Sequence, residues 1–382
     1  MITRIYIDNY KCFSNFEYRP AANELLLGRN GAGKSSVFDV LRMLKNLIHQ
    51  GLSVMDCDLL GLDTLTRWDT RDVQRFEMDV DGREVLYRYS LTLEYDRDAS
   101  RYRIGEETLD FAPHDAAQYP SRLFTRRRDE GQLFRDDGSE GPNVMMDWHR
   151  SGLYSIQPRH DNTRLTWFKE RVGRTHCIRI VPALMSGWTV SEDDAPNSDL
   201  SNYASWYRHL NQEEPRVREL LHQSLREVID GFSTFSLKRV TEEGRRLCAD
   251  LETDGKPFTY DLSQLSDGQR ALVALYTFSA YASEFAGPRD KPITLCLDEP
   301  ENYVALSEIQ PWILEIGDCA DGEHAQLLMA SHHPELIDHY AHTSASLFYR
   351  DDGGPVQTKP FGPGLENELP PSEIVARGWE DE

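Results

Sequence analysis

The chain has 382 residues and a formal net charge of −22, from 42 Lys and Arg against 64 Asp and Glu. It contains no run of about 18 apolar residues, the length that crosses a bilayer, and its N-terminus does not read as a signal peptide. Composition therefore excludes membrane transport by this chain alone. A phosphate backbone attracts clustered positive charge, so the acidic balance also argues against non-specific duplex binding. The six cysteines show no paired spacing and predict free thiols in a reducing compartment, the cytoplasm.

Residues 28–35 read GRNGAGKS, the Walker A pattern that cradles nucleotide phosphates with backbone N–H groups. The apolar segment 23–27 predicts a strand before it, and apolar residues at helical spacing over 37–48 predict a helix after it. We expect Lys34 to reach the β- and γ-phosphates of ATP and the Ser35 hydroxyl to coordinate Mg²⁺. The predicted nucleotide-binding residues of this loop are Gly28, Asn30, Gly31, Gly33, Lys34, Ser35 and Ser36.

The middle of the chain is informative only in outline. Residues 74–111 alternate in strand-like patterns and predict an antiparallel meander. Residues 112–165 are rich in Arg, Asp, Gly and Pro and predict an irregular insertion. Helical periodicity returns over 199–230, without the sustained heptads of a coiled-coil arm, and 232–260 predicts short strands. A cluster of four arginines lies beside Phe124 in the sequence: Arg122, Arg126, Arg127 and Arg128. We interpret it as an exposed loop whose charge is neutralised by Asp129 and Glu130. Contact with nucleic acid or with an acidic partner is the alternative.

Residues 265–270 read LSDGQR and precede an apolar helical segment, 271–278. Ser266 is therefore expected at a helix N-terminus, with its hydroxyl and the N–H groups free to meet an anion. An ordinary serine N-cap is the alternative.

An apolar run from Ile293 to Leu297 predicts a strand buried on both faces, and it ends in Asp298 and Glu299. Acids at the carboxyl end of a central strand lie at the ligand crevice. We expect Asp298 to hold Mg²⁺ and Glu299 to act as the general base toward water; a pair of solvated loop acids is the alternative. Residues 326–331 predict another buried strand, which ends at His332. A metal site there is disfavoured because no Cys or His at zinc spacing accompanies it.

The LSDGQR segment resembles the signature of ATP-binding-cassette (ABC) ATPases, usually LSGGQ or LSSGQ, with Asp267 in place of the small third residue. The resemblance implies that Ser266, Gly268 and Gln269 face the γ-phosphate held by a second subunit, so that ATP joins two heads into a homodimer or a higher oligomer. It also implies that His332 is the switch histidine that hydrogen-bonds the γ-phosphate. Gln50 matches a metal-reaching glutamine of chromosome-maintenance ATPases by spacing; Gln74 and an ordinary surface glutamine are the alternatives.

The opening segment, MITRIYIDNYKCFSNFEYRP, resembles the first strands of RecF, of the structural-maintenance-of-chromosomes (SMC) proteins and of OLD-like ATPases. This resemblance implies that Lys11 lies near the nucleotide phosphates. The DEPEN and SHHPE stretches are similar to predicted ATPases of bacterial anti-phage systems, including Septu-type ATPases that work with a nuclease. The resemblance covers residues 1–50 and 262–340.

Together these features predict an α/β fold: an ABC-ATPase head with a P-loop and a mostly parallel sheet flanked by helices, plus an antiparallel β subdomain and an inserted helical lobe. The expected divisions are 1–111 with Walker A and the meander, 112–230 as an irregular and helical insertion, and 231–382 with the signature, Walker B and the switch histidine.

The predicted function is ATP binding and hydrolysis with Mg²⁺, in which head pairing regulates a partner effector, a nuclease, in anti-phage defence. The alternative is a RecF- or SMC-like ATPase that acts directly on DNA in repair. A scaffold that never hydrolyses ATP is disfavoured by Glu299. A separate nuclease chain is expected because no nuclease pattern is visible after residue 340.

Overall fold

The computed structural model describes residues 1–82, 84–114, 121–285, 292–319, 325–362 and 369–378. The chain divides into two compact units, and each is described by itself. The first unit comprises 1–175 and 345–361, and the second comprises 176–344 and 362–382. The boundaries of this division differ from the expected ones at residues 111 and 230. The insertion expected over 112–230 is split between the units because its first half continues a sheet and its second half joins a helical layer.

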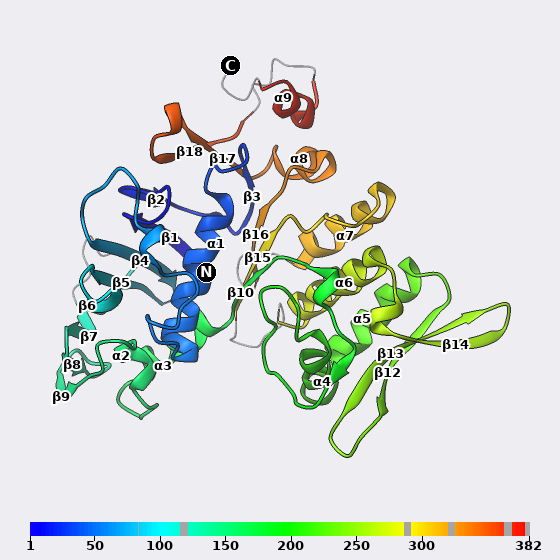
Figure 1. Ribbon diagram of the computed structural model, residues 1–382, viewed down its shortest axis with the longest axis horizontal. Coiled ribbons are helices and arrows are strands. Elements are labelled where there is room, and N and C mark those ends of the chain that lie inside the picture. Colours follow the sequence, from blue (N-terminus) through cyan, green and yellow to red (C-terminus); the bar gives the residue numbers. More distant parts are fainter. Residues whose placement is uncertain (83, 115–120, 286–291, 320–324, 363–368, 379–382) are drawn as a thin grey trace. The chain divides into compact units, whose positions relative to one another are not determined.

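An antiparallel sheet dominates the first unit (Figure 1). Its central strands alternate between buried and half-buried residues, as in β5, so that one face packs on the core. The meander predicted over 74–111 is confirmed as β4, β5 and β6. The eight described strands, in order across the sheet, are β2 (Phe16–Tyr18), β1 (Ile2–Asp8), β4 (Val73–Asp81), β5 (Val85–Asp96), β6 (Arg101–Pro113), β7 (Ser121–Arg127), β8 (Glu130–Phe134) and β9 (Glu140–Met145).

The prediction of an irregular segment over 112–165 is wrong for most of its first part. Residues 121–145 form β7, β8 and β9, which extend the meander to the edge of the sheet. The edge strand β9 is exposed at nearly every position. Strands that bury little on either face carry no apolar alternation, so their composition resembles that of a loop.

The first unit also contains a smaller group of strands that carries the phosphate loop. Strand β3 (Asn23–Leu27) pairs in parallel with β17 (Ala345–Arg350), and β17 pairs antiparallel with β18 (Val356–Pro360). The strand predicted at 23–27 is thus confirmed. Helix α1 (Lys34–Lys45) follows the loop and continues into a π-helical turn, Asn46–Gln50. Its predicted apolar face is buried.

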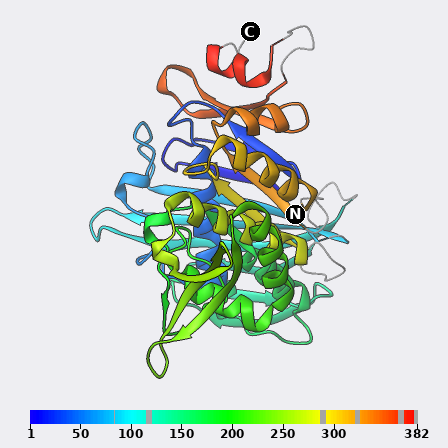
Figure 2. The ribbon, with the colours of Figure 1, turned by 90° about the vertical axis from the view of Figure 1, so that its right-hand side faces the viewer.

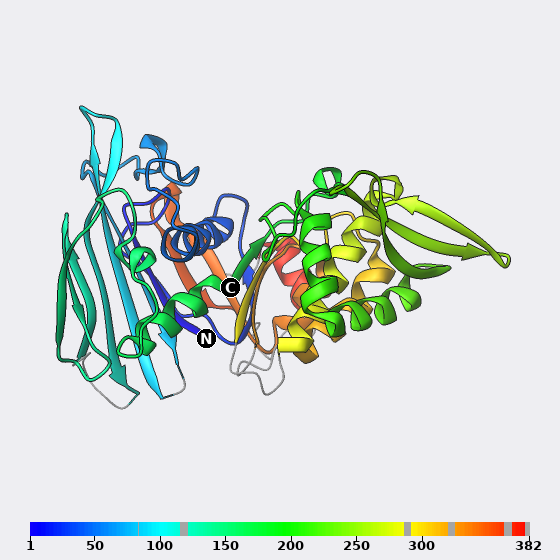
Figure 3. The ribbon, with the colours of Figure 1, turned by 90° about the horizontal axis from the view of Figure 1, so that it is seen from below.

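Two further helices of the first unit lie beside the large sheet, as seen from below in Figure 3: α2 (Gly152–Ser155) and α3 (Thr163–Gly173). The ring of Phe168 on α3 lies 5.9 Å from the rings of Tyr87 and Tyr89 on β5. Burying an aromatic ring of this size contributes about 1.5–3 kcal/mol, so this contact fixes α3 against the sheet.

The second unit combines a parallel strand pair with a helical layer. Strand β15 (Ile293–Asp298) pairs in parallel with β16 (Ala325–Ala330), and β10 (Thr175–Ile178) neighbours β15. Both β15 and β16 are buried almost throughout, which confirms the two predicted apolar strands. The helices are α4 (Tyr203–Glu213), α5 (Pro215–Val228), α6 (Asp267–Phe285), α7 (Leu306–Cys319), α8 (Pro334–Tyr340) and α9 (Pro371–Arg377).

Helix α6 lies at the centre of this helical layer. The segment predicted as an apolar helix, 271–278, is buried on all sides. The hydroxyls of Tyr203 on α4 and Thr277 on α6 are 2.8 Å apart, and the indole N–H of Trp312 on α7 donates to the carbonyl of Leu275 at 3.2 Å. These bonds satisfy the polar atoms of side chains that otherwise pack in an apolar environment.

The second unit also contains a small antiparallel sheet: β11 (Trp188–Thr189), β12 (Phe232–Arg239), β13 (Arg245–Thr253) and β14 (Lys256–Asp261). Strand β13 pairs with each of the other three, which confirms the strands predicted over 232–260. The β12–β13 hairpin projects past the helices of its own unit (Figure 2).

Candidate functional site

The phosphate loop joins β3 to α1 in the first unit. Gly28, Gly31 and Gly33 have φ angles of 137°, 78° and 100°, in the left-handed region that residues with side chains rarely adopt. A Cβ atom at Gly28 would lie 2.1 Å from the carbonyl oxygen of Phe348 in β17. Glycine is therefore required at position 28 both by its conformation and by the neighbouring strand.

The N-terminus of α1 is arranged to meet an anion. Its N-cap, Gly33, provides no side-chain hydrogen bond to the first turn. Lys34 is buried, and its Nζ atom donates to the carbonyl oxygens of Gly28 and Arg29 at 2.5 and 3.4 Å. Asn30, Gly31 and Ser35 are exposed and Ser36 is half-buried. Helix N–H groups, the helix dipole and an ammonium group gathered at one loop fit a chain of phosphates.

The loop between β1 and β2 packs directly against the phosphate loop. A Cβ atom at Gly33 would lie 3.2 Å from both Cys12 Sγ and the Phe13 ring. The Nζ atom of Lys11 lies 2.7 Å from Oδ2 of Asp39 on α1. The structure thus ties Lys11 to the helix that begins at the phosphate loop, and its contact with phosphates stays a prediction.

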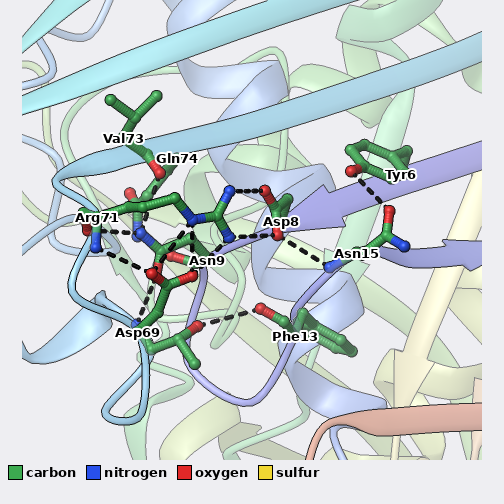
Figure 4. Close-up of polar contacts among 10 residues, drawn as sticks. Tyr6, Asp8, Asn9, Phe13, Asn15, Asp69, Arg71, Val73 and Gln74 are labelled. Carbon is green, nitrogen blue, oxygen red and sulfur yellow. Dashed lines mark hydrogen bonds and ion pairs between the residues drawn. The ribbon is translucent and has the colours of Figure 1, made fainter.

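Figure 4 shows the polar network that holds this loop. Asp8 forms an ion pair with Arg71 at 2.7 Å, and the amide of Asn9 donates to the carbonyl oxygens of Arg71 and Val73. The buried amide of Gln74 donates to the carbonyl of Asn9 at 2.9 Å. Gln74 thus supports the main chain of this loop from inside the core, and its role as the metal-reaching glutamine stays an untested alternative. Gln50 is exposed at the end of its π-helical turn, and its metal contact stays a prediction.

The paired carboxylates lie in the second unit, where β15 ends. Asp298 is its last residue, and Glu299 follows with a left-handed φ of 50°. The N–H of Glu299 still donates to the carbonyl of Ala330 on β16 at 2.8 Å, so the turn begins while the strand pairing continues. Glu299 thus keeps an uncommon backbone conformation directly beside a paired strand, as residues at functional sites often do.

Two side chains converge on one oxygen of Glu299. The amide nitrogen of Asn302 lies 2.9 Å from its Oε2 atom, and a guanidinium nitrogen of Arg179 lies 3.4 Å from the same atom. Asn302 belongs to the DEPEN stretch, but Arg179 follows β10, more than a hundred residues earlier in the chain. The sequence analysis missed Arg179 because no local motif marks it.

The predicted switch residue follows β16. His332 is exposed, and its main-chain N–H lies 3.4 Å from Oε1 of Glu301. The next residue, His333, is the N-cap of α8, where its Nδ1 atom accepts from the N–H of Glu335 at 3.3 Å. His333 therefore serves the helix. Among the residues that the structure describes, no group of three or more His, Cys, Asp or Glu could hold a metal ion.

The signature segment begins α6 in the second unit. Ser266 Oγ accepts from the N–H of Gln269 at 3.2 Å, and the Gln269 side chain accepts from the N–H of Ser266 at 3.0 Å. This reciprocal pair is a capping box. Ser266 thus caps α6 as an acceptor, as the N-cap alternative expects, but this bond does not use its hydroxyl hydrogen, and its contact with a γ-phosphate stays a prediction. A Cβ atom at Gly268 would lie 3.0 Å from the carbonyl of Tyr303, so the signature packs on the turn that follows Walker B.

The arginine cluster is not the exposed loop that the sequence predicted. Arg126 is fully buried, and its guanidinium donates to the carbonyl oxygens of Arg128, Arg150 and Asp147. Arg122 and Arg127 lie on β7 and pair with acids of β6, at 2.7 and 3.0 Å. Cross-strand partners on β6, Asp110 and Glu106, thus replace the expected neutralisation by Asp129 and Glu130.

Arg128 belongs to a different environment. It lines a cavity of about 210 Å³ in the first unit together with Arg101, Arg103 and Trp148. The Arg101 guanidinium lies 4.8 Å from the Trp148 ring, within the range of a cation–π contact.

The predicted site residues thus fall into two sets. The phosphate loop and Lys11 belong to the first unit, whereas the signature, the paired carboxylates and His332 belong to the second. All six cysteines are free, and in the described part of the chain no helix is long and apolar enough to cross a membrane.

A phosphate loop and a buried strand that ends in paired carboxylates, carried on an α/β fold, define an ATP-binding ATPase. The chain belongs to the family described as "AAA domain, putative AbiEii toxin, Type IV TA system", whose model matches residues 25–338. No curated protein matches the sequence.

The chain is also similar to solved structures. An SMC head bound to the C-terminal winged-helix domain of ScpA has a TM-score of 0.52 and 12% identity, over 94% of this chain and 98% of that one. The SMC head domain from Thermotoga maritima has a TM-score of 0.45 and 14% identity, over 95% of this chain and 99% of that one. The first likeness supports the predicted ABC-ATPase head fold.

Proposed function

We propose that this protein hydrolyses ATP, and that ATP-driven pairing of two heads regulates a separate effector, a nuclease, in bacterial anti-phage defence. The observation that carries the proposal is Glu299, which follows a buried strand and has one oxygen held by Asn302 at 2.9 Å. A carboxylate fixed in this way is suited to accept a proton from water. The family description, which includes a toxin of a type IV TA system, supports a role in controlling an effector.

The residues present fit ATP and Mg²⁺. The N-terminal turn of α1 has no side-chain cap, and Lys34 lies at the carbonyl oxygens of the loop. The Ser35 hydroxyl and the Asp298 carboxylate are the hard oxygen ligands that Mg²⁺ prefers. A Mg²⁺ ion held by them would neutralise charge on the phosphates during the reaction.

In the proposed reaction, water attacks the γ-phosphorus, Glu299 takes the proton of that water, and the bond from the γ-phosphorus to the bridging oxygen breaks to leave ADP. His332 would donate a hydrogen bond to the γ-phosphate. Lys34 and the loop N–H groups would stabilise the negative charge that develops on the phosphate oxygens.

The proposed partner site on a second copy consists of Ser266, Gly268 and Gln269. This role is supported by the position of these residues at the N-terminus of a long helix, α6, where Ser266 and Gln269 form the capping box. The free cysteines are consistent with a reducing compartment and thus with a cytoplasmic protein.

Native mass spectrometry tests this proposal. The wild-type protein and Glu299→Gln would be measured with and without ATP and Mg²⁺, together with any chain that co-purifies. We expect Glu299→Gln with ATP to shift to a dimer, and Lys34→Ala to stay a monomer because it cannot bind the nucleotide. Ser266→Arg should bind ATP but not pair. A monomer in every condition, with no ATP hydrolysis by the wild-type protein, would contradict the proposal.

A second candidate function is direct action on DNA, as in RecF- or SMC-like repair ATPases. The cavity lined by Arg101, Arg103, Arg128 and Trp148 favours it, since arginine and an aromatic ring suit a phosphate and a base, although Asp96 and Asp129 also line it and reduce its positive charge. The double variant Arg101→Glu/Arg128→Glu should then weaken binding of a single-stranded oligonucleotide and reduce its salt dependence. Equal binding by both proteins would remove this candidate.

A further inference from the structure

Glu301, the third carboxylate of the DEPEN stretch, is bonded to the end of the neighbouring strand. Its Oε1 atom accepts from the hydroxyl of Ser331 at 2.7 Å and lies 3.4 Å from the main-chain N–H of His332. Ser331 follows β16 and is fully buried. One carboxylate oxygen thus connects the turn that contains Glu299 with the segment that contains the switch histidine.

The connection continues beyond His332. Ser331 Oγ, which donates to Glu301, also accepts from the N–H of His333 at 2.9 Å. The His333 ring in turn accepts from the N–H of Glu335 in the first turn of α8. The main chain is therefore held on both sides of His332 by a continuous series of hydrogen bonds that starts at Glu301.

The other oxygen of Glu301 is unusual. Its Oε2 atom is buried and has no hydrogen-bond partner among the residues that the structure describes. Burial also raises the pKa of Glu301. A buried carboxylate oxygen without a donor is costly, so this residue does not serve stability alone.

We propose that Glu301 is a positioning residue for the switch histidine: by holding Ser331, it fixes the main chain at His332 relative to the turn that contains Glu299. The inference rests on the proposed function for its kinetic test, because it assigns a role in ATP hydrolysis. It also makes a structural claim that can be measured without any hydrolysis.

The kinetic test compares Glu301→Ala, Glu301→Gln and Ser331→Ala in the full chain. We expect Glu301→Ala and Ser331→Ala each to lower kcat about tenfold, the effect of losing one hydrogen bond to a charged group, while KM for ATP changes less than about twofold. The double variant should be no slower than either single variant, because both remove the same connection. Glu301→Gln keeps an acceptor and should retain kcat within about threefold of the wild type.

The matched control is Glu213→Ala, an exposed glutamate at the end of α4, which should leave kcat unchanged. Wild-type kcat in Glu301→Ala would overturn the proposal. So would a loss in Glu301→Gln as large as that in Glu301→Ala, because the accepted hydrogen bond would then not be the cause.

Amide hydrogen exchange separates this proposal from the proposed function. In the protein without nucleotide, Glu301→Ala should speed exchange in peptides that cover 331–335 by about fivefold or more, whereas Glu301→Gln and Glu213→Ala should not. Faster exchange in a protein that shows no hydrolysis would support the positioning role and contradict the proposed function. Unchanged exchange in Glu301→Ala would overturn the positioning role, whether or not the protein hydrolyses ATP.

Discussion

The amide of Asn302 donates to Glu299 across a turn in which Glu299 itself has a left-handed φ of 50°. The same Glu299 oxygen lies 3.4 Å from Arg179, a side chain that is 62% exposed. An exposed ion pair at this distance contributes little, since solvent screens it. The amide hydrogen bond therefore determines the orientation of the carboxylate, and the arginine can leave it at small cost.

Replacement of Glu299 by Gln should separate ATP binding from hydrolysis. The amide cannot accept the proton of the attacking water, so we expect the hydrolysis rate to fall by about 100-fold or more while the affinity for ATP is retained. Phosphate release and equilibrium binding of a fluorescent ATP analogue would measure the two effects. Glu213→Gln is the control, and hydrolysis by Glu299→Gln at the wild-type rate would show that another group is the base.

Gly28→Ala should damage both the phosphate loop and the stability of the first unit. The new Cβ would lie 2.1 Å from the Phe348 carbonyl, at a φ of 137°. We expect the free energy of unfolding to fall by at least about 2 kcal/mol and ATP binding to be lost. Gly31→Ala is the matched control, because its Cβ would meet no atom within 4 Å and only the backbone conformation would be strained. Urea titration of both variants measures the difference.

Arg126 and Arg127 are adjacent in sequence but should respond differently to substitution. Arg126 is buried beside Glu107, at 3.8 Å, whereas the Arg127 side chain is 83% exposed. Arg126→Met leaves a buried carboxylate and three main-chain carbonyls without this donor, so it should lower the free energy of unfolding by about 3–5 kcal/mol. Arg127→Met should change it by less than about 0.5 kcal/mol. Similar losses in both would mean that Arg126 is not buried in solution.

His222 should make the second unit sensitive to mild acid. Burial, with Arg218 and Arg226 nearby, lowers its pKa from 6.5 to about 4. The unfolded chain therefore binds a proton first as the pH falls, and the contribution of His222 to stability is lost between about pH 6.5 and 4. At pH 5 this loss is about 2 kcal/mol. Thermal unfolding of the wild type and His222→Gln at pH 7 and 5 would measure it; an equal pH dependence in both would contradict the expectation.

Several parts of the fold follow from local patterns in the sequence. The strand at 23–27 and the buried strand before Asp298 are each marked by a continuous apolar run that ends at a motif. The helix after Gly33 is marked by apolar residues at helical spacing that follow a motif. The ABC-head fold is also predictable, because these motifs occur in the order that is typical of it. These elements are predictable because their burial is nearly complete and the residues that form them are close in sequence.

Other features could not be predicted, for identifiable physical reasons. Strands β8 and β9 bury little, so they lack the alternation that marks β5. The hydrogen bond that Ser266 Oγ accepts is expected only in the N-cap alternative; it forms because Gln269 lies three residues away and closes a capping box. Arg179 is brought to Glu299 by the tertiary fold, and no local sequence pattern predicts that contact.

The carbonyl of Phe348 that confines Gly28 lies some three hundred residues later in the chain, in a strand that completes the first unit. During synthesis on the ribosome, the phosphate loop therefore emerges long before the strand that shapes it. Domains generally fold as units while the chain is made, but here the unit stays incomplete until residue 361 has left the exit tunnel. The nascent chain thus gains a complete phosphate loop only after Ser266, the paired carboxylates and His332 have all been synthesised.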